Sequence, residues 1–152
     1  MKKFITFLLI LLPWYLSSLV PIDKAYYNSL SLPFFTPPPI FYGIAWTIAY
    51  IGIAISIYQI VTTYKLKEIP KSYKYTLLIN YLCNQSFQVV FFLLKNRFLG
   101  FISCLATFVT ALFLYKETSD LKEKSTKYLN FYVLLSLFAT FLSLVIYLLN
   151  VA

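Results

Sequence analysis

The sequence predicts an all-α integral membrane protein, a single bundle of five transmembrane helices. Three observations support this fold class. Hydrophobic residues make up 61% of the 152 residues and charged residues only 12%, against about 45–50% and about 25% in soluble domains. Five long apolar runs contain no charged residue, and the basic residues gather in alternate connections between those runs. Together these features exclude a disordered chain and an ordinary water-soluble domain.

Five apolar runs have the length of about 17–25 residues that crosses the hydrocarbon core of a bilayer. A charged side chain at the middle of a bilayer costs at least about 2.5–3.5 kcal/mol, and none of the runs contains Asp, Glu, Lys or Arg. We expect one domain, 1–152, whose spans cover residues 4–20, 41–63, 76–94, 98–115 and 129–150.

The first run has a second interpretation, as a secretory signal peptide. Lys2 and Lys3 precede an apolar stretch from Phe4 to Leu12, which is typical of the charged and apolar regions of such a leader. The run nevertheless continues through Trp14 to Val20, and no convincing small-residue cleavage site follows it. We therefore expect a span here.

The 13 Lys and Arg residues divide unevenly between the two sides of the predicted bundle. Ten share the side of the N-terminus: Lys2, Lys3, Lys65, Lys67, Lys71, Lys74, Lys116, Lys122, Lys124 and Lys127. Three lie opposite: Lys24, Lys95 and Arg97. Because cytoplasmic loops are enriched in Lys and Arg, we expect a multi-pass protein of a bacterial cell membrane with its N-terminus in the cytoplasm. The net charge of +8 then reflects topology and attraction to membrane lipid, and nucleic acid is not an expected partner.

The connection between the first two spans, residues 21–40, is rich in proline. It contains Pro21, Pro33, Pro37, Pro38 and Pro39. Proline fixes φ and has no N–H, so we expect a stiff, non-helical loop on the outer side. Composition leaves two interpretations open, a lid over the bundle and a rigid connector.

Uncharged polar side chains recur at helical spacing in three spans, where lipid offers them no partner. Asn80, Asn84 and Gln88 share one face of the third span, and Gln85 lies beside them. The polar residues of the fourth and fifth spans are Ser103, Thr107, Thr110, Ser136, Thr140, Ser143 and Tyr147. We expect the Ser and Thr residues to join helices by hydrogen bonds. The carboxamides either do the same or orient a ligand in an apolar pocket.

Trp46 and Tyr50 lie one helical turn apart just inside the second span, below the loop that carries Tyr26 and Tyr27. They form either the aromatic wall of a site for a large flat hydrophobe or an anchor at the membrane interface. The chain has no histidine, and no acidic residue lies within a span. We therefore predict no metal site, no resident cofactor and no conventional acid–base catalytic site.

The run Pro33-Phe34-Phe35-Thr36-Pro37-Pro38, followed by Gly43, Trp46-Thr47 and Tyr50, resembles the signature of the translocator protein family, the tryptophan-rich sensory proteins called TspO/MBR. The resemblance extends over nearly the whole chain. It includes Pro21-Ile22-Asp23, Asn84-Gln85 and Phe138-Ala139-Thr140.

The resemblance implies a five-helix bundle, often a homodimer, with a pocket below the first loop that binds porphyrins and similar large hydrophobic ligands. The protein would then be a receptor, a carrier or a stress-related regulator. The ligand-binding residues that it implies are Tyr27, Pro38, Trp46, Tyr50, Asn84, Gln85, Leu135 and Ala139. Two alternatives stay open. One is an enzyme that degrades protoporphyrin with light and oxygen, in which Trp46 takes part in radical steps, and the other is a structural or regulatory membrane subunit.

The chain departs from the family pattern mainly by having fewer tryptophans. Phe35, Phe87 and Leu135 stand where the family commonly has Trp, Phe131 stands at a usual proline, and Ser103 replaces a frequent acidic residue. Trp46 is therefore the only tryptophan that we expect in the pocket. This favours ligand binding over a mechanism that needs two redox-active tryptophans.

Overall fold

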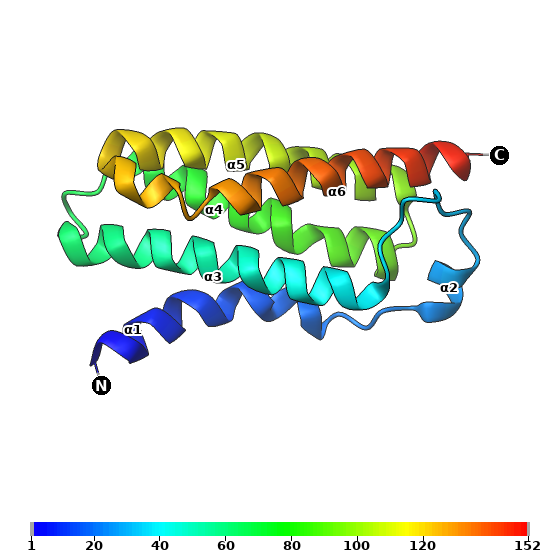
Figure 1. Cartoon of the computed structure of the whole chain (residues 1–152), viewed down its shortest axis with the longest axis horizontal. Coiled ribbons are helices and arrows are strands. Elements are labelled where there is room, and N and C mark those ends of the chain that lie inside the picture. Colours follow the sequence, from blue (N-terminus) through cyan, green and yellow to red (C-terminus); the bar gives the residue numbers. More distant parts are fainter. Residues whose placement is uncertain (1, 152) are drawn as a thin grey trace.

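The computed structural model describes residues 2–151, and its helices run side by side along one long axis (Figure 1). The elements are α1 (Lys2–Leu11), the 3-10 segment η1 (Leu12–Leu19), α2 (Lys24–Asn28), α3 (Pro39–Thr63), α4 (Lys71–Gln88), the π-helical segment η2 (Val89–Leu93), α5 (Arg97–Thr126) and α6 (Asn130–Leu149). Residues 2–151 contain no β-strand. The predicted fold class, an all-α five-helix membrane bundle, is confirmed.

Four predicted spans correspond to helices that are long and apolar enough to cross a membrane: α3, α4 with η2, α5 and α6. Helix α3 starts at Pro39, slightly before the predicted span, because the first turn of a helix does not need the N–H that proline lacks. Helix α5 reaches Thr126, past the predicted end of its span at residue 115, since its last turns are polar and lie beyond the apolar run; the backbone kinks at Lys122, whose φ and ψ are not helical.

The first predicted span, residues 4–20, consists of an α-helical part followed by a 3-10 helical part. The change from α1 to η1 occurs at Pro13, which removes one N–H from the hydrogen-bond ladder. A 3-10 helix rises about 2.0 Å per residue and an α-helix about 1.5 Å. The 10 residues of α1 and the 8 residues of η1 therefore rise about 31 Å together, close to the thickness of about 30 Å of the hydrocarbon core.

The proline-rich connection, predicted to be wholly non-helical, contains one short helix, α2. None of the prolines lies within residues 24–28. The Asp23 side chain caps the turn by accepting a hydrogen bond from the Tyr26 amide at 2.9 Å. We refer to residues 20–38, which join η1 to α3 and include α2, as loop 1.

The polar faces of α4 and α5 meet as predicted, whereas the hydroxyl groups of α6 bond mainly within their own helix. Ser86 of α4 and Ser103 of α5 share a hydrogen bond of 2.7 Å. On α6, Ser136, Thr140 and Ser143 donate instead to carbonyl oxygens of their own helix. A buried Ser or Thr hydroxyl can satisfy itself on the preceding turn, so helical spacing alone did not reveal its partner.

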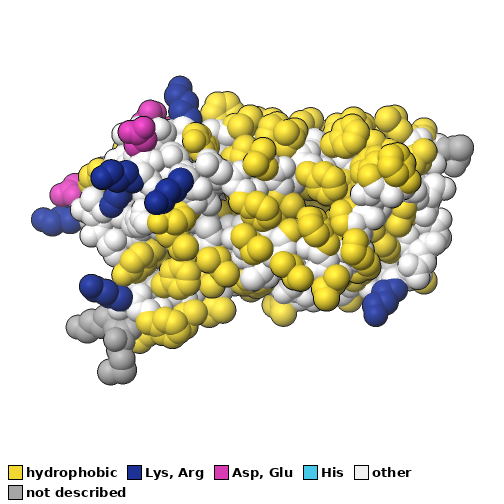
Figure 2. Space-filling model, viewed as in Figure 1, with side chains coloured by type: hydrophobic (Ala, Val, Ile, Leu, Met, Phe, Trp, Pro, Cys, Tyr) yellow, Lys and Arg dark blue, Asp and Glu magenta, His cyan; other side chains and the backbone are white. Residues whose placement is uncertain are grey.

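The charged residues gather at one end of the bundle. On the face shown in Figure 2, most Lys and Arg side chains lie at the end that carries the N-terminus, and the acidic side chains lie there too. Apolar side chains cover the remaining length of this face. This distribution matches a helix bundle whose sides contact lipid. Among the basic residues counted from the sequence, the Lys2 side chain lies outside the described part.

Candidate ligand-binding site

Aromatic side chains from α3, α6 and η1 meet inside the bundle. The ring centroids of Trp46 and Tyr50 lie 5.7 Å apart, as their spacing of one turn predicts. Tyr132 of α6 lies 6.3 Å from Trp46, and Trp14 of η1 lies 5.8 Å from Tyr50. Tyr132 has no exposed surface and Tyr50 is 8% exposed. Trp46 and Tyr50 therefore face the interior, which rules out a purely interfacial anchor for this pair.

Trp14 corrects the expectation that Trp46 is the only tryptophan at this site. Trp14 is 3% exposed and contacts Tyr81 of α4 at 5.3 Å as well as Tyr50. Its place in the sequence carries a signal, because it lies near the middle of the first span and not at either interface, where an anchoring tryptophan is expected. The adjacent Pro13 marks the irregular backbone that brings this side chain inward.

Two neighbouring carboxamides of α4 complete this group. Tyr50 Oη donates a hydrogen bond of 3.0 Å to Asn84 Oδ1, and Gln85 Nε2 donates one of 3.1 Å to the same oxygen. Asn84 is 7% exposed. The two hydrogen bonds use its carbonyl oxygen, and its amide group, which lies beside Tyr132, keeps at least one N–H donor. We call Trp14, Trp46, Tyr50, Asn84, Gln85 and Tyr132 the inner cluster.

Gln85 has a structural task that the sequence did not reveal. Its Oε1 accepts a hydrogen bond of 2.7 Å from the Ser17 amide, and its Nε2 donates one of 3.2 Å to the Trp14 carbonyl. Tyr81, one turn earlier on α4, donates to the Pro13 carbonyl at 3.1 Å. These side chains satisfy backbone groups of η1 within an apolar environment. Gln85 thereby fixes η1, and with it Trp14, against α4.

Asn80 is also structural. It has no exposed surface. Its Nδ2 donates to the Thr107 carbonyl at 3.1 Å and to Thr110 Oγ1 at 2.9 Å, and its Oδ1 accepts from Tyr132 Oη at 3.0 Å. Both amide hydrogens and the carbonyl oxygen are occupied. Asn80 therefore joins α4, α5 and α6, and no N–H donor remains for a ligand.

The other predicted ligand-binding residues lie at different depths. Leu135 is 6% exposed and packs in the same apolar core as Trp46. Tyr27 of α2 lies farther out, in a second group with Phe87 and with Phe92, whose ring centroid is 6.3 Å away. Pro38, immediately before α3, is exposed, and Ala139 of α6 is half-buried. The structure thus brings Trp46, Tyr50, Asn84, Gln85 and Leu135 together, with Tyr27 on loop 1 in a separate apolar group.

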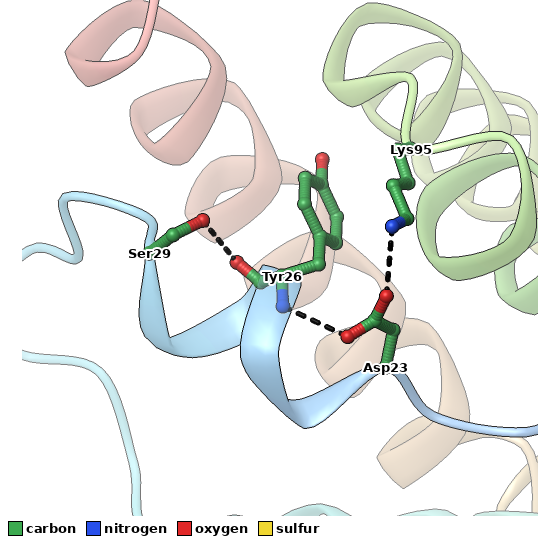
Figure 3. Close-up of polar contacts among 4 residues, drawn as sticks. All are labelled: Asp23, Tyr26, Ser29 and Lys95. Carbon is green, nitrogen blue, oxygen red and sulfur yellow. Dashed lines mark hydrogen bonds and ion pairs between the residues drawn. The ribbon is translucent and has the colours of Figure 1, made fainter.

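An ion pair ties one end of loop 1 to the α4–α5 connection (Figure 3). Asp23 Oδ2 lies 2.8 Å from Lys95 Nζ, while the other carboxylate oxygen caps α2. The Lys95 ammonium also lies 5.8 Å from the centre of the Tyr26 ring. The hydrogen-bonded Lys95 ammonium, followed by the Tyr26 amide, lowers the pKa of Asp23 below its ordinary value of 3.8. Lys95 has φ of 51°, a left-handed conformation that is strained for a residue with a side chain.

A second contact ties the other half of loop 1 to the end of α6. The Ser31 amide donates to Asn150 Oδ1 at 2.9 Å, and Asn150 Nδ2 returns a hydrogen bond of 2.9 Å to the Ser31 carbonyl. Both attachments of loop 1 are exposed polar contacts. Contacts of this kind contribute little to stability, so the release of loop 1 is opposed mainly by its apolar contacts, which include the buried Leu30 and the stacked rings of Phe35 and Phe141.

The inner cluster is closed in this structure. Its hydrogen bonds run between its own members, η1 and Asn80, and Tyr50, Asn84 and Tyr132 are all buried. Two hollows on the described surface lie elsewhere, one between α1 and α4 and one beside the α4–α5 connection. A ligand that reaches Trp46 and Asn84 must therefore displace loop 1 or some of the aromatic side chains of the inner cluster.

Comparison with known proteins agrees with the fold. The model of the TspO/MBR family matches residues 4–149. The chain belongs to the TspO/MBR family. It is similar to the tryptophan-rich protein TspO of Bacillus cereus, with 39% identity over 138 residues that cover 90% of this chain and 89% of the relative. It is also 37% identical over 128 residues to the uncharacterized membrane protein YtaB of Bacillus subtilis, with coverage of 84% and 82%. The resemblance of the proline-rich loop and the Trp-Thr-x-x-Tyr segment to TspO/MBR proteins is thus confirmed.

Proposed function

We propose that this TspO/MBR protein binds a porphyrin or a similar large planar hydrophobe between loop 1 and the inner cluster, as a receptor or carrier. The observation that carries the proposal is the arrangement of Trp46, Tyr50 and Asn84. Two aromatic rings and a carboxamide with an unused donor meet in an otherwise apolar interior. Ligand sites in proteins typically combine such apolar walls with a few oriented polar groups.

The proposed binding mode separates the roles of these residues. The flat faces of Trp46 and Tyr50 would pack against the macrocycle, and the Asn84 amide would donate to an oxygen or nitrogen at its edge. Tyr27 of loop 1 and the apolar side chains packed around it would cover the ligand. Entry requires the release of loop 1, which is attached through Asp23–Lys95 and Ser31–Asn150.

A fluorescence titration tests the proposal. In a Trp14→Phe variant, Trp46 is the only tryptophan, and protoporphyrin is expected to quench its emission saturably with micromolar affinity. Trp46→Phe combined with Asn84→Ala, followed by the change in protoporphyrin absorbance, is expected to abolish saturable binding. Quenching that rises linearly without saturation, or unchanged binding by the double variant, would refute the site.

One observation favours a second candidate function, light- and oxygen-dependent degradation of the bound porphyrin. Trp14 and Trp46 flank Tyr50 at 5.8 and 5.7 Å, so two oxidisable indoles lie next to one phenol. Illumination of the purified protein with protoporphyrin in air tests this function. A new absorbing product that requires the protein, and that decreases in Trp14→Phe and in Trp46→Phe, would support it. Light-driven loss of porphyrin at the same rate without protein would exclude it.

We also propose that the N-terminus faces the cytoplasm of a bacterial cell. The support is the excess of Lys and Arg in the connections on that side. In a variant without Cys83 and Cys104, a cysteine introduced at Lys24 should react with a membrane-impermeant maleimide added to intact cells. A cysteine introduced at Lys67 should react only after lysis. The reverse pattern would contradict this orientation.

A further inference from the structure

A groove with a volume of about 340 Å³ opens on the side of the bundle between α1 and α4. Leu9 of α1 and Leu78 of α4 form its rims and are 68% and 52% exposed. Trp14 and Ile57 also line the groove, and both are buried, so they form its floor. The groove shares Trp14 with the inner cluster, but Trp46, Tyr50 and Asn84 do not line it.

The groove exists because the first helix changes direction at Pro13. Beyond this point, η1 is held on α4 by Tyr81 and Gln85, which bond to its backbone. Before it, α1 packs chiefly on α3, where the rings of Phe7 and Tyr58 lie 6.3 Å apart. Helix α1 and helix α4 therefore diverge from the Pro13–Tyr81 contact toward the basic end of the bundle.

One charged side chain, Lys74, lines the groove. Lys74, Leu77, Leu78 and Tyr81 follow one face of α4, with Lys74 nearest the basic end. Lys74 Nζ donates to the Leu66 carbonyl at 2.7 Å, which holds the ammonium at the mouth of the groove. The hydrogen bond from Ser72 to Glu117 places that carboxylate on the α5 side of α4. Among the described residues, none that lines the groove beside Lys74 is acidic.

We propose that the groove binds one anionic phospholipid from the leaflet that adjoins the basic end. An acyl chain would lie between Leu9 and Leu78 above Trp14, and the phosphate of the headgroup would pair with Lys74. The groove opens sideways into the region of the bilayer, and it combines apolar walls with a cation at the level of the headgroups. A chain of methylenes with a terminal anion matches this arrangement.

Quenching of Trp14 by brominated lipid tests the proposal. The protein would carry Trp46→Phe, so that Trp14 is the only tryptophan, and would be placed without porphyrin in nanodiscs of phosphatidylcholine. A minor fraction of the lipid carries brominated acyl chains, and the headgroup of this brominated lipid is varied between experiments. Brominated phosphatidylglycerol is expected to occupy the groove with about fivefold higher affinity than brominated phosphatidylcholine. This factor corresponds to about 1 kcal/mol for one lysine at an anionic surface.

Matched variants distinguish a specific lipid site in the groove from a general electrostatic attraction between the protein and anionic lipid. Lys74→Gln should remove the preference for phosphatidylglycerol, Lys74→Arg should retain it, and Lys116→Gln, at an exposed position on α5, should leave it unchanged. Leu78→Phe should fill the groove and reduce quenching by both lipids, whereas Leu137→Phe on α6 should not. Equal quenching by both headgroups, or equal effects of Lys74→Gln and Lys116→Gln, would overturn the proposal. Quenching that falls as more copies share a nanodisc would show that a second copy covers the groove, and would overturn it too.

Discussion

Asn80 and Asn84 are both asparagines and lie one turn apart on α4, but their hydrogen-bond partners differ. Asn80 bonds to two helices through all of its polar groups, partly through a backbone carbonyl. Asn84 accepts from the side chains of Tyr50 and Gln85 and keeps at least one amide donor. A side chain whose polar groups are all used maintains the fold. A side chain with an unused donor among aromatic rings can additionally bind a ligand.

The largest expected effect on stability follows from Asn80→Ala. The substitution removes three hydrogen bonds, each worth about 0.6 kcal/mol on average within membrane bundles, and is expected to lower the free energy of unfolding by about 2 kcal/mol. The loss is measured by thermal unfolding in detergent with Asn84→Ala as the matched control. A larger destabilisation by Asn84→Ala than by Asn80→Ala would contradict the assigned roles.

A smaller effect is expected for Gln85→Ala. It removes the side chain that satisfies the Ser17 amide and the Trp14 carbonyl, but η1 still packs through Trp14. We expect a loss of about 1 kcal/mol and a shift of Trp14 emission to longer wavelength in the Trp46→Phe background. Gln88→Ala, at another half-buried glutamine of α4, is the control. An unchanged Trp14 spectrum in Gln85→Ala would mean that η1 does not depend on Gln85.

The smallest effect concerns the pH dependence of loop 1. Because the folded pKa of Asp23 is lowered, its contribution is fully present above its unfolded pKa of about 3.8 and is lost as the pH falls through the folded pKa. Hydrogen exchange of the α2 amides should therefore accelerate as the pH is lowered below about 3.8, after correction for the intrinsic exchange rate. Asp23→Asn should show faster corrected exchange at neutral pH and no such acid transition. The same transition in Asp23→Asn would assign it to another group.

The architecture could be predicted from the sequence because a segment that crosses lipid has a simple pattern, a long apolar run without charged residues. Charge-free apolar runs located the four long apolar helices and the shorter first one, and the spacing of Trp46 and Tyr50 on one helix predicted their contact. Loop 1 was predicted less well. Proline content indicated a loop without helix, but the side chain of Asp23 supplied a local cap that formed α2.

The partners of polar groups could not be predicted from the sequence. Gln85 was expected to bind a ligand. In the structure it also forms hydrogen bonds with backbone atoms of η1, a segment far away in the chain whose backbone is irregular because of Pro13. Helical spacing shows that Asn80, Asn84 and Gln85 face the interior or its edge. It does not show which oxygen or nitrogen reaches them, because that depends on the register between helices.

The affinity of the Asn80→Ala and Asn84→Ala variants for protoporphyrin tests the central claim most directly. Both substitutions remove a carboxamide from α4, so they are matched in chemistry and differ by one helical turn. With binding measured per folded molecule, Asn80→Ala is expected to keep the parent affinity and Asn84→Ala to weaken binding about tenfold, as for the loss of one hydrogen bond in an apolar site. Parent-like binding by Asn84→Ala, or equal weakening in both variants, would contradict a ligand site at Asn84.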